Sequence, residues 1–330
     1  MKRLKHANVI LPALITFVSV WLLLKSIDVD FFLRMLKNTR LPALAAGVAF
    51  YAGSYSSRAF RLQRCVHNHS FSFVRLIPVV AVHNFLNIMF PAKTGDLSLL
   101  YLLKKKFHVE YTKSFGAWVL IRALDAATLI VSLDVAIAAL YFSNKLEMGR
   151  QVFWSLVALH GFFVFSGGLF VLFLVAHKFD LLKAVVQNWR ERGFFARFFR
   201  LANDVKQALT YGVRSENMLS LALSSLALWV CQFGFFYWVI QSAGVTDIGI
   251  AQVVVGCFGA ILTLFLPINS FAGIGTFEVG WIAGFLLVGV DSDVSLQLAV
   301  FFHTWMIVIA ASAVPVTLAG ERLMGRLFSA

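Results

Sequence analysis

Long blocks of apolar residues alternate along the chain with short polar segments rich in Lys and Arg. The clearest blocks, residues 152–176, 218–240 and 296–318, are each longer than the about 20 residues that a helix needs to cross a hydrocarbon core. The pattern predicts a chain that is helical throughout. We expect about six full membrane spans, at residues 8–25, 41–58, 114–142, 152–176, 218–242 and 296–320.

Two further apolar regions, 76–103 and 249–290, are interrupted by polar and small residues. Basic loops of membrane proteins lie in the cytoplasm, and the flanks of 76–103 are basic whereas those of 249–290 carry no Lys or Arg. Each region therefore enters and leaves on one side, as two full helices or as a re-entrant hairpin. The short arms of 76–103 favour a re-entrant hairpin, and we favour the same form for 249–290.

The count of basic residues also assigns sides to the other segments. Expected in the cytoplasm are the N-terminus, residues 58–75, 104–113 and 178–214, and the C-terminal tail; residues 243–249 and 291–295 are expected outside. Residues 25–40 are basic too, but Asp28 and Asp30 accompany them, and we interpret this segment as an external interfacial helix. Basic residues and Phe interleave between residues 177 and 215, which is typical of an amphipathic helix at the membrane surface.

Together these assignments predict an all-α polytopic membrane protein with a single transmembrane domain over residues 1–330. The first half, 1–142, contains the re-entrant region 76–103, and the second half, 218–330, contains the re-entrant region 249–290. Residues 143–217 form a linking helix and a basic cytoplasmic amphipathic segment. Two hairpins that enter from opposite faces are the arrangement of an inverted repeat, the scaffold of many alternating-access transporters.

Composition supports the membrane assignment and narrows the chemistry. The chain is 60% apolar and 14% charged, against about 25% charged in soluble domains. Its net charge of +13 would suit nucleic acid in a soluble protein, but basic residues beside membrane helices bind anionic head groups instead. The three cysteines and the remaining residues show no metal-ligand spacing and no nucleophile–base motif. We expect no catalytic residue, metal or cofactor.

The first interruption has the sequence FPAKTGD, residues 90–96. Pro91 ends a helix, Gly95 allows a tight turn, and Thr94 can cap the helix that follows. Lys93 and Asp96 would then lie deep in the bilayer, where an isolated charge costs at least about 2.5 kcal/mol. One interpretation is a Lys93–Asp96 pair that only closes the turn. We favour a polar pocket in which the helix N-terminus and Lys93 receive an anionic group such as a lipid phosphate.

The second interruption has the sequence PINSFAGIGTFE, residues 267–278. Gly273 and Gly275 break the helix, Thr276 can cap the next one, and Glu278 lies in its first turn. Glu278 either complements the helix dipole or is a buried carboxylate that titrates or pairs with a substrate amine or a cation. Similar breaks in both halves of a chain are a sequence pointer to a transporter's site.

Other polar residues fall within the apolar segments. Arg122 and Asp125 lie three apart on one helix and can pair, while Asn84 and Asn87 lie close to the first interruption. We interpret His303 and Gln232 as hydrogen-bond partners between helices. The predicted substrate-binding residues are therefore Asn84, Asn87, Lys93, Thr94, Gly95, Asp96, Arg122, Asp125, Gly273, Gly275, Thr276 and Glu278.

Both interruptions resemble motifs of the lysylphosphatidylglycerol synthase transmembrane (UPF0104) family. The segment Pro91 to Asp96 is similar to the family's Pro-x-Arg-x-Gly-Glu, and the segment Pro267 to Glu278 is similar to its Pro…Gly-x-Gly-x-x-Glu. The resemblance covers essentially the whole chain. Lys93 and Asp96 replace the family's Arg and Glu. Two further Arg positions of the family are Leu99 and Phe277 here, which leaves the particular lipid open.

The resemblance implies a flippase-like transporter in the cytoplasmic (inner) membrane of a bacterial cell, with both termini in the cytoplasm. Lys93 and Arg122 would bind the phosphate of an amphipathic lipid, and Asp96, Asp125 and Glu278 would hold those cations or a positive part of the head group. Membrane lipids are then the expected partners, nucleic acid is not, and a second copy of the chain or a lipid-biosynthesis enzyme are further candidates. The alternatives are a lipid-modifying enzyme that uses Asp96 and Glu278 as acid and base, and a non-catalytic subunit of a biosynthetic complex.

Overall fold

The computed structural model describes residues 2–66, 72–91, 94–144, 161, 215–265 and 270–327, and within these ranges it contains helices and no strands. The helices are α1 (Lys2–Ser26), α2 (Val29–Lys37), α3 (Leu41–Val66), α4 (Phe73–Met89), α5 (Asp96–Phe107), α6 (Tyr111–Phe142), α10 (Ser215–Ser242), α11 (Ile250–Phe265), the short 3₁₀ helix η2 (Phe271–Gly273), α12 (Thr276–Leu286) and α13 (Ser292–Leu327). The all-helical prediction is confirmed for these residues. The predicted span 152–176 and the basic segment 178–214 lie outside them, apart from Gly161.

Within the described residues, three helices are long and apolar enough to cross a membrane: Tyr111–Phe142, Met218–Ser242 and Ser292–Leu323. Their outward faces carry large apolar side chains; Val131 and Val135 on α6, and Leu219 and Leu223 on α10, are exposed one helical turn apart. Apolar stripes of this kind on the outside of a helical bundle are typical of lipid-facing surfaces. The protein is therefore embedded in a membrane.

Helix α3 packs along α10, and it is longer than its sequence pattern predicted. The expected span ended at residue 58, but α3 continues to Val66. Beyond Arg58, the side chains of Ala59, Leu62 and Val66 remain buried at helical spacing, so the apolar period continues through a segment that its basic residues had assigned to a loop. Consequently Arg58 and Arg61 lie within the helical bundle.

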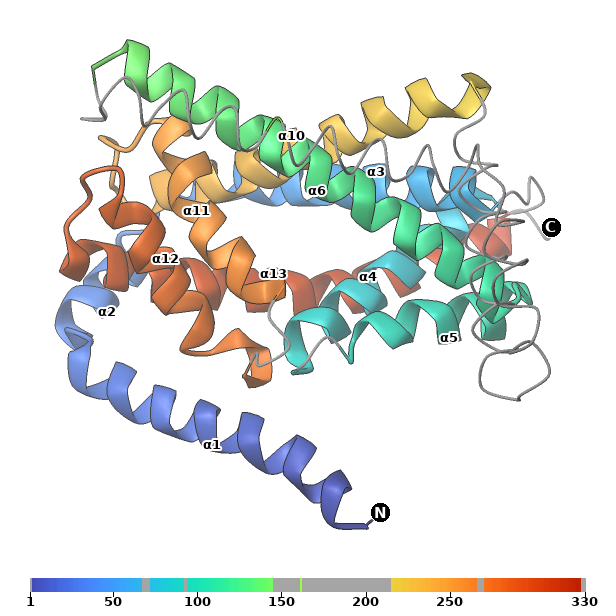
Figure 1. Ribbon diagram of the computed structural model, residues 1–330, viewed down its shortest axis with the longest axis horizontal. Coiled ribbons are helices and arrows are strands. Elements are labelled where there is room, and N and C mark those ends of the chain that lie inside the picture. Colours follow the sequence, from blue (N-terminus) through green and yellow to red (C-terminus); the bar gives the residue numbers. More distant parts are fainter. Residues whose placement is uncertain are drawn as a thin grey trace, which may run out of the picture.

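Two hairpins of shorter helices approach each other from opposite ends of the bundle (Figure 1). The first hairpin is α4 and α5, of 17 and 12 residues, and the second is α11 and α12, of 16 and 11 residues. Each is shorter than the about 20 residues of a full span. The tips meet midway along the long helices, where α4 contacts η2.

The connections group at the two ends of the bundle as the charge count predicted. Basic residues at the end of α3, at the end of α5 and at the start of α6 share one end, while the connections 243–249 and 287–291 share the other with α2 (Figure 1). The predicted helix within residues 25–40 is α2, capped by Asp28, whose carboxylate accepts a 2.9 Å hydrogen bond from the Phe31 amide. Which end faces the cytoplasm stays a prediction.

The arms of the second hairpin cross in backbone contact. Glycines face one another there: a Cβ added to Gly259 would collide with the Gly280 carbonyl, and one added to Gly284 with the Gly256 carbonyl. Small residues permit this close approach between membrane helices. The hairpin is therefore a thin, tightly packed unit.

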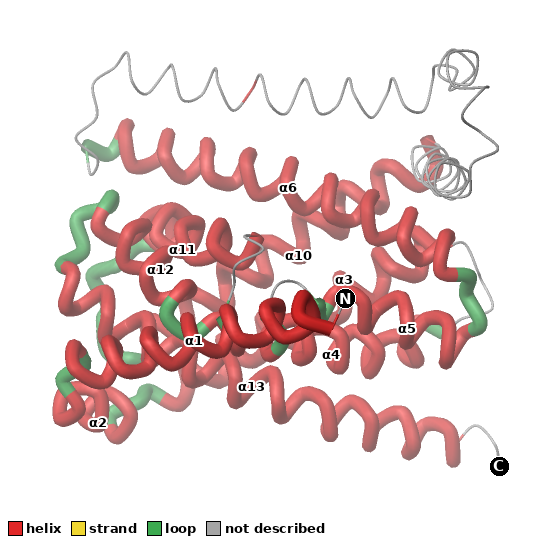
Figure 2. Tube along the Cα trace, turned by 60° about the horizontal axis from the view of Figure 1, so that its bottom comes forward, coloured by secondary structure: helices red, strands yellow, loops and turns green. Residues whose placement is uncertain are grey.

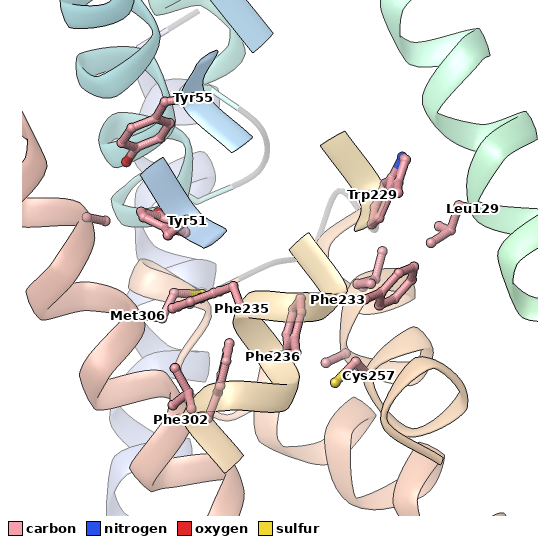
Figure 3. Packing of buried hydrophobic residues seen from close by; sticks show 14 of the residues in the cluster. Tyr51, Tyr55, Leu129, Trp229, Phe233, Phe235, Phe236, Cys257, Phe302 and Met306 are labelled. Atoms are coloured by element: carbon pink, nitrogen blue, oxygen red, sulfur yellow. The ribbon is translucent and has the colours of Figure 1, made fainter. Parts of the chain in front are cut away.

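Aromatic rings fix the second hairpin to α10 and α13. The Phe302 ring stacks on the Phe236 ring with centroids 4.6 Å apart, and Trp281 of α12 packs against Phe302 at 4.9 Å. Figure 3 shows Phe235, Phe236 and Phe302 in this cluster. Helix α1 covers the tip from outside, as Figure 2 shows in front of the bundle, and its Thr16 hydroxyl accepts a 3.0 Å hydrogen bond from the Phe271 amide.

Candidate functional site

A cavity of about 130 Å³ lies between the two hairpin tips. Asp125 and Trp229 on its wall are near the midpoints of α6 and α10, so the cavity lies halfway along the long helices. Its wall is built from eight helical elements: Tyr51 and Arg58 of α3; Asn84, Asn87 and Ile88 of α4; Arg122 and Asp125 of α6; Leu228, Trp229, Gln232 and Phe236 of α10; Ile261 of α11; Ala272 of η2; Phe277 of α12; His303 and Met306 of α13. Tyr51, Trp229, Phe236 and Met306 are labelled in Figure 3.

Three arginines of the described part of the chain belong to this region, and one of them, Arg58, lines the cavity without a carboxylate partner there. Arg58 donates a long hydrogen bond of 3.4 Å to Gln232 Oε1, and its Nε meets no acceptor among the described residues. Asn87 Oδ1 and Trp229 Nε1, on the same wall, are likewise buried without partners in the described part of the chain. Buried polar atoms left unpaired are costly, and here they surround a cavity that a polar ligand could fill.

Behind this wall, Arg61 forms a buried ion pair that joins three helices. Its guanidinium donates to both carboxylate oxygens of Asp125, at 2.6 and 3.2 Å, and to Ser225 Oγ at 3.0 Å. Arg61 is only 1% exposed. A two-pronged pair of this kind ties α3, α6 and α10 together with fixed geometry.

The first tip is held by an ion pair of Asp96 and Arg122. Arg122 Nη2 lies 2.6 Å from Asp96 Oδ1, with the two side chains 25% and 11% exposed. His83 Nε2 is 3.8 Å from the same carboxylate, and its Nδ1 is 3.1 Å from Ser98 Oγ. Arg122 and Asp125, which the sequence suggested could pair with each other, pair instead with residues of α5 and α3, because those helices approach α6 from two sides.

Thr94 and Asn84 have local roles at this tip. Thr94 does not cap α5 as expected, because its hydroxyl donates to the Pro91 carbonyl at 2.8 Å and Gly95 takes the N-cap position. Asn84 donates to the Tyr51 hydroxyl at 2.7 Å. Lys93 lies outside the described residues, so its predicted pairing and its predicted role are untested.

The second tip is held by a carboxylate–imidazole pair. Glu278 Oε2 accepts a 2.6 Å hydrogen bond from the Gly275 amide, which places its carboxylate at the N-terminus of α12; Gly275, and not Thr276 as expected, takes the N-cap position. Its other oxygen, Oε1, lies 2.5 Å from His303 Nδ1, and His303 Nε2 lies 2.8 Å from the Ala272 carbonyl. Ala272 has a positive φ of 53° and Gly275 one of 89°. His303 is thus an interhelical partner, as predicted.

The structure gathers much, though not all, of the predicted set at the cavity. Asn84, Asn87, Arg122 and Asp125 line it, and Asp96 is paired to one of them. Gly273, Gly275, Thr276 and Glu278 shape the second tip, of which Ala272 and Phe277 face the cavity. No group of three or more His, Cys, Asp or Glu side chains that could hold a metal occurs in the ranges described.

Arg58 and Arg61 were missed by the sequence prediction. Their charge placed them in a cytoplasmic loop, although the pattern of apolar residues around them is helical up to Val66. Two arginines three residues apart lie on one face of a helix. Within an apolar stretch, that spacing was the available sign that Arg58 and Arg61 belong to a helix and not to a loop.

The family comparison agrees with the resemblance found in the two interruptions. Among curated proteins, none matches the chain. The family model of the lysylphosphatidylglycerol synthase TM region matches residues 9–313, which include every residue that lines the cavity and both hairpins. The chain belongs to the lysylphosphatidylglycerol synthase TM region family.

Proposed function

We propose that the protein is a transporter that moves a phosphate-containing amphipathic lipid between the leaflets of the cytoplasmic membrane. Membership of a lipid-handling membrane family supports this proposal. The observation that carries it is Arg58, a guanidinium on the wall of a mid-bundle cavity that has no carboxylate partner among the described residues. An unpaired cation at membrane depth is costly unless it serves a ligand.

The charges around the cavity favour an anionic head group. Three guanidinium groups, those of Arg58, Arg61 and Arg122, face two carboxylates, those of Asp96 and Asp125. Among these five described groups the excess is one positive charge, and it lies on Arg58. Guanidinium groups bind phosphate oxygens in a planar, two-pronged geometry. In our proposal Arg58 is the phosphate-binding residue, with Arg122 beside it, and the acyl chains stay in the bilayer.

The two hairpins supply a path for the head group. Two short hairpins that approach from opposite ends resemble the broken helices that form the central site of many transporters. In this proposal each hairpin is re-entrant, the two halves form an inverted repeat, and non-helical backbone at the tips is tolerated because it borders the cavity. Movement of one hairpin at a time would open the cavity to one leaflet and then to the other.

The test is a leaflet-exchange assay in vesicles. Purified protein is reconstituted with phosphatidylcholine and a trace of fluorescent phosphatidylglycerol, and a membrane-impermeant quencher reports the label in the outer leaflet. We expect Arg58→Gln to slow exchange by roughly tenfold to a hundredfold, the factor for losing one hydrogen-bonded charge contact. Glu321→Gln, which alters the ion pair with Lys106 outside the cavity, is the matched control and is expected to behave as wild type.

The outcomes separate the three candidate functions. Exchange without chemical change of the lipid, lost in Arg58→Gln, supports the transporter. A modified lipid in the extracted vesicles would support a lipid-modifying enzyme that uses Asp96 and Glu278. Equal rates with wild type, Arg58→Gln and empty vesicles would contradict the transporter and favour a non-catalytic subunit.

A further inference from the structure

The most buried charged contact of the second tip is not used by the proposed head-group site. Glu278 and His303 are each 4% exposed at their side chains. Glu278 accepts a hydrogen bond at the N-terminus of α12 and contacts His303 of α13, and His303 also contacts the Ala272 carbonyl of η2. The pair therefore connects α12, η2 and α13. Ala272 and His303 also line the cavity. Any change in this pair therefore acts on the cavity wall itself.

The geometry fixes the number of protons in the pair. A carbonyl oxygen only accepts hydrogen bonds, so His303 Nε2, 2.8 Å from the Ala272 carbonyl, carries a proton. A neutral imidazole then has a bare Nδ1, yet Nδ1 lies 2.5 Å from Glu278 Oε1. Two bare acceptors do not approach so closely. A second proton must lie between Nδ1 and Oε1, whether it is assigned to the imidazole or to the carboxyl group.

Loss of that proton breaks one of two contacts. If the remaining imidazole proton stays on Nε2, the bare Nδ1 faces a carboxylate and the contact between α12 and α13 is lost. If it moves to Nδ1, the bare Nε2 faces the Ala272 carbonyl and the contact between η2 and α13 is lost. Both contacts belong to the tip, where Ala272 already holds a positive φ. A tip with a strained residue persists only while its surroundings hold it.

We propose that Glu278 and His303 form the binding site of one exchangeable proton, and that this proton latches the second hairpin to α13. Bound, it makes the pair neutral overall and keeps the tip closed on the cavity. Released to water in the cavity, it leaves a carboxylate and a neutral imidazole, a net charge of −1, and the tip separates from α13. No bond between heavy atoms forms or breaks. Rebinding of a proton from water restores the latch.

In a transporter this latch supplies the coupling ion, and that step rests on the proposed function. A proton taken up while the cavity is open to one side, and released when it is open to the other, drives the lipid cycle. The anionic head group and the proton site share one cavity, so a negative charge on the released pair repels a phosphate and favours its departure.

Few other charges face the pair. Across the cavity lie Arg58, Arg122 and Asp125. Where the structure describes side chains, the titratable ones on α13 itself and on the elements packed against α12, α13 and η2 are Lys25 on α1, Asp30, Arg34 and Lys37 on α2, Arg75 and His83 on α4, Cys231 and Tyr237 on α10, Cys257 on α11, and Asp293, Glu321 and Arg322 on α13. The hydrogen bonds of Glu278 and His303 described here involve none of these side chains. Beside His83, the negative charge of Asp96 is offset by the positive charge of Arg122.

The latch is tested on the whole protein in lipid nanodiscs, without any substrate. Hydrogen–deuterium exchange of peptides covering residues 270–280 is followed from about pH 5 to about pH 8 and corrected for the intrinsic rate. Wild type should show a step in which the tip amides exchange roughly tenfold faster at the higher pH, the factor for one lost hydrogen bond. Peptides of α6 in the same sample serve as the internal reference.

Glu278→Gln is the decisive variant. A Gln side chain can accept from the Gly275 amide and donate to Nδ1, so it imitates the protonated pair and has no proton to lose. We expect the tip to stay closed at every pH, with the step absent. His303→Gln, which removes the imidazole, should also lack the step, whereas Glu321→Gln should keep it. The latch is refuted if wild type has no step, or if the step persists in Glu278→Gln.

Failure of the latch and failure of the proposed function are distinguishable. If phosphatidylglycerol is exchanged across vesicles but the tip shows no step, the coupling site is wrong and the transporter stands. If the step is present and sensitive to Glu278→Gln but no lipid is exchanged, the proton site stands and the transporter is wrong. When both are correct, an imposed proton gradient changes the exchange rate in wild type and leaves Glu278→Gln unaffected.

Discussion

The two walls of the cavity differ in the kind of charge that they carry. On the side of α3 and α6, the described cations are the guanidinium groups of Arg58, Arg61 and Arg122, and the last two form ion pairs with Asp125 and Asp96. On the side of η2, α12 and α13, the charged pair is Glu278–His303, to which we assign one exchangeable proton. The first wall offers a constant field for an anion. The second wall offers a charge that can change.

The two hairpins differ in how they are held to the rest of the bundle. The first hairpin is held to α6 by an ion pair that is partly exposed to the cavity. The second is packed on itself through facing glycines and joined to α13 by one buried polar pair and a cluster of rings. A rigid body with one polar latch is suited to move as a unit, whereas a wall built on buried ion pairs is suited to stay fixed. The predictions below test this contrast.

The largest effect is expected where the fixed wall loses its buried carboxylate. Asp125→Ala leaves Arg61 charged, buried and without a counter-ion, which costs about 3–5 kcal/mol of folding free energy. Thermal unfolding of the protein in detergent should show this as a large fall in the midpoint. A midpoint within a degree or two of wild type would mean that Arg61 reaches water or another partner, and the fixed wall would lose its main support.

A smaller effect is expected at the crossing of α11 and α12. Gly280→Val places a side chain against the Gly259 carbonyl and against Thr263, and overpacking of this kind costs about 1–3 kcal/mol. The same unfolding assay measures it. Gly320→Ala is the matched control, because nothing lies within 4 Å of its added Cβ and a helical Ala in place of Gly stabilises by about 0.5–1 kcal/mol. Equal effects of the two changes would contradict the tight crossing.

The smallest effect is expected at the basic end of the bundle. Lys106 Nζ lies 2.6 Å from Glu321 Oε2, but both side chains are partly exposed, and such pairs contribute about 0–1 kcal/mol. Lys106→Ala should therefore change the unfolding midpoint little, and the difference should shrink further at high salt. A loss as large as that of Asp125→Ala would show that an exposed pair can match a buried one here, and would remove the distinction on which the fixed wall depends.

The sequence predicted the fold class, the two broken regions and their opposite entry, because apolar length and basic flanks are local signals. It also brought Asn84, Asn87, Arg122 and Asp125 into one candidate site, and the structure places all four on the cavity wall. It could not predict which carboxylate meets which arginine. Those pairings join residues 26 and 64 positions apart, and they depend on how α5 and α3 approach α6.

Arg58 and Arg61 show where a general rule fails. The excess of Lys and Arg at cytoplasmic ends is a statistical preference, and it assigned both residues to a loop. In the folded protein the charge of Arg61 is paired with Asp125, and its guanidinium also donates to Ser225, so the charge no longer excludes it from the bundle. Burial of the Arg61 charge is possible only because of these tertiary partners. A local sequence pattern contains no information on partners so distant in the chain.

The pairing of Arg61 has a consequence for biosynthesis. Asp125 follows it by 64 residues and Ser225 by 164, and a growing chain folds from its N-terminus onward. When α3 leaves the ribosome, Arg58 and Arg61 have no counter-ion, and α3 is not among the helices apolar enough to enter a membrane by itself. We therefore expect α3 to reach its final depth only after α6 and α10 have been synthesised, so that an early helix is completed late.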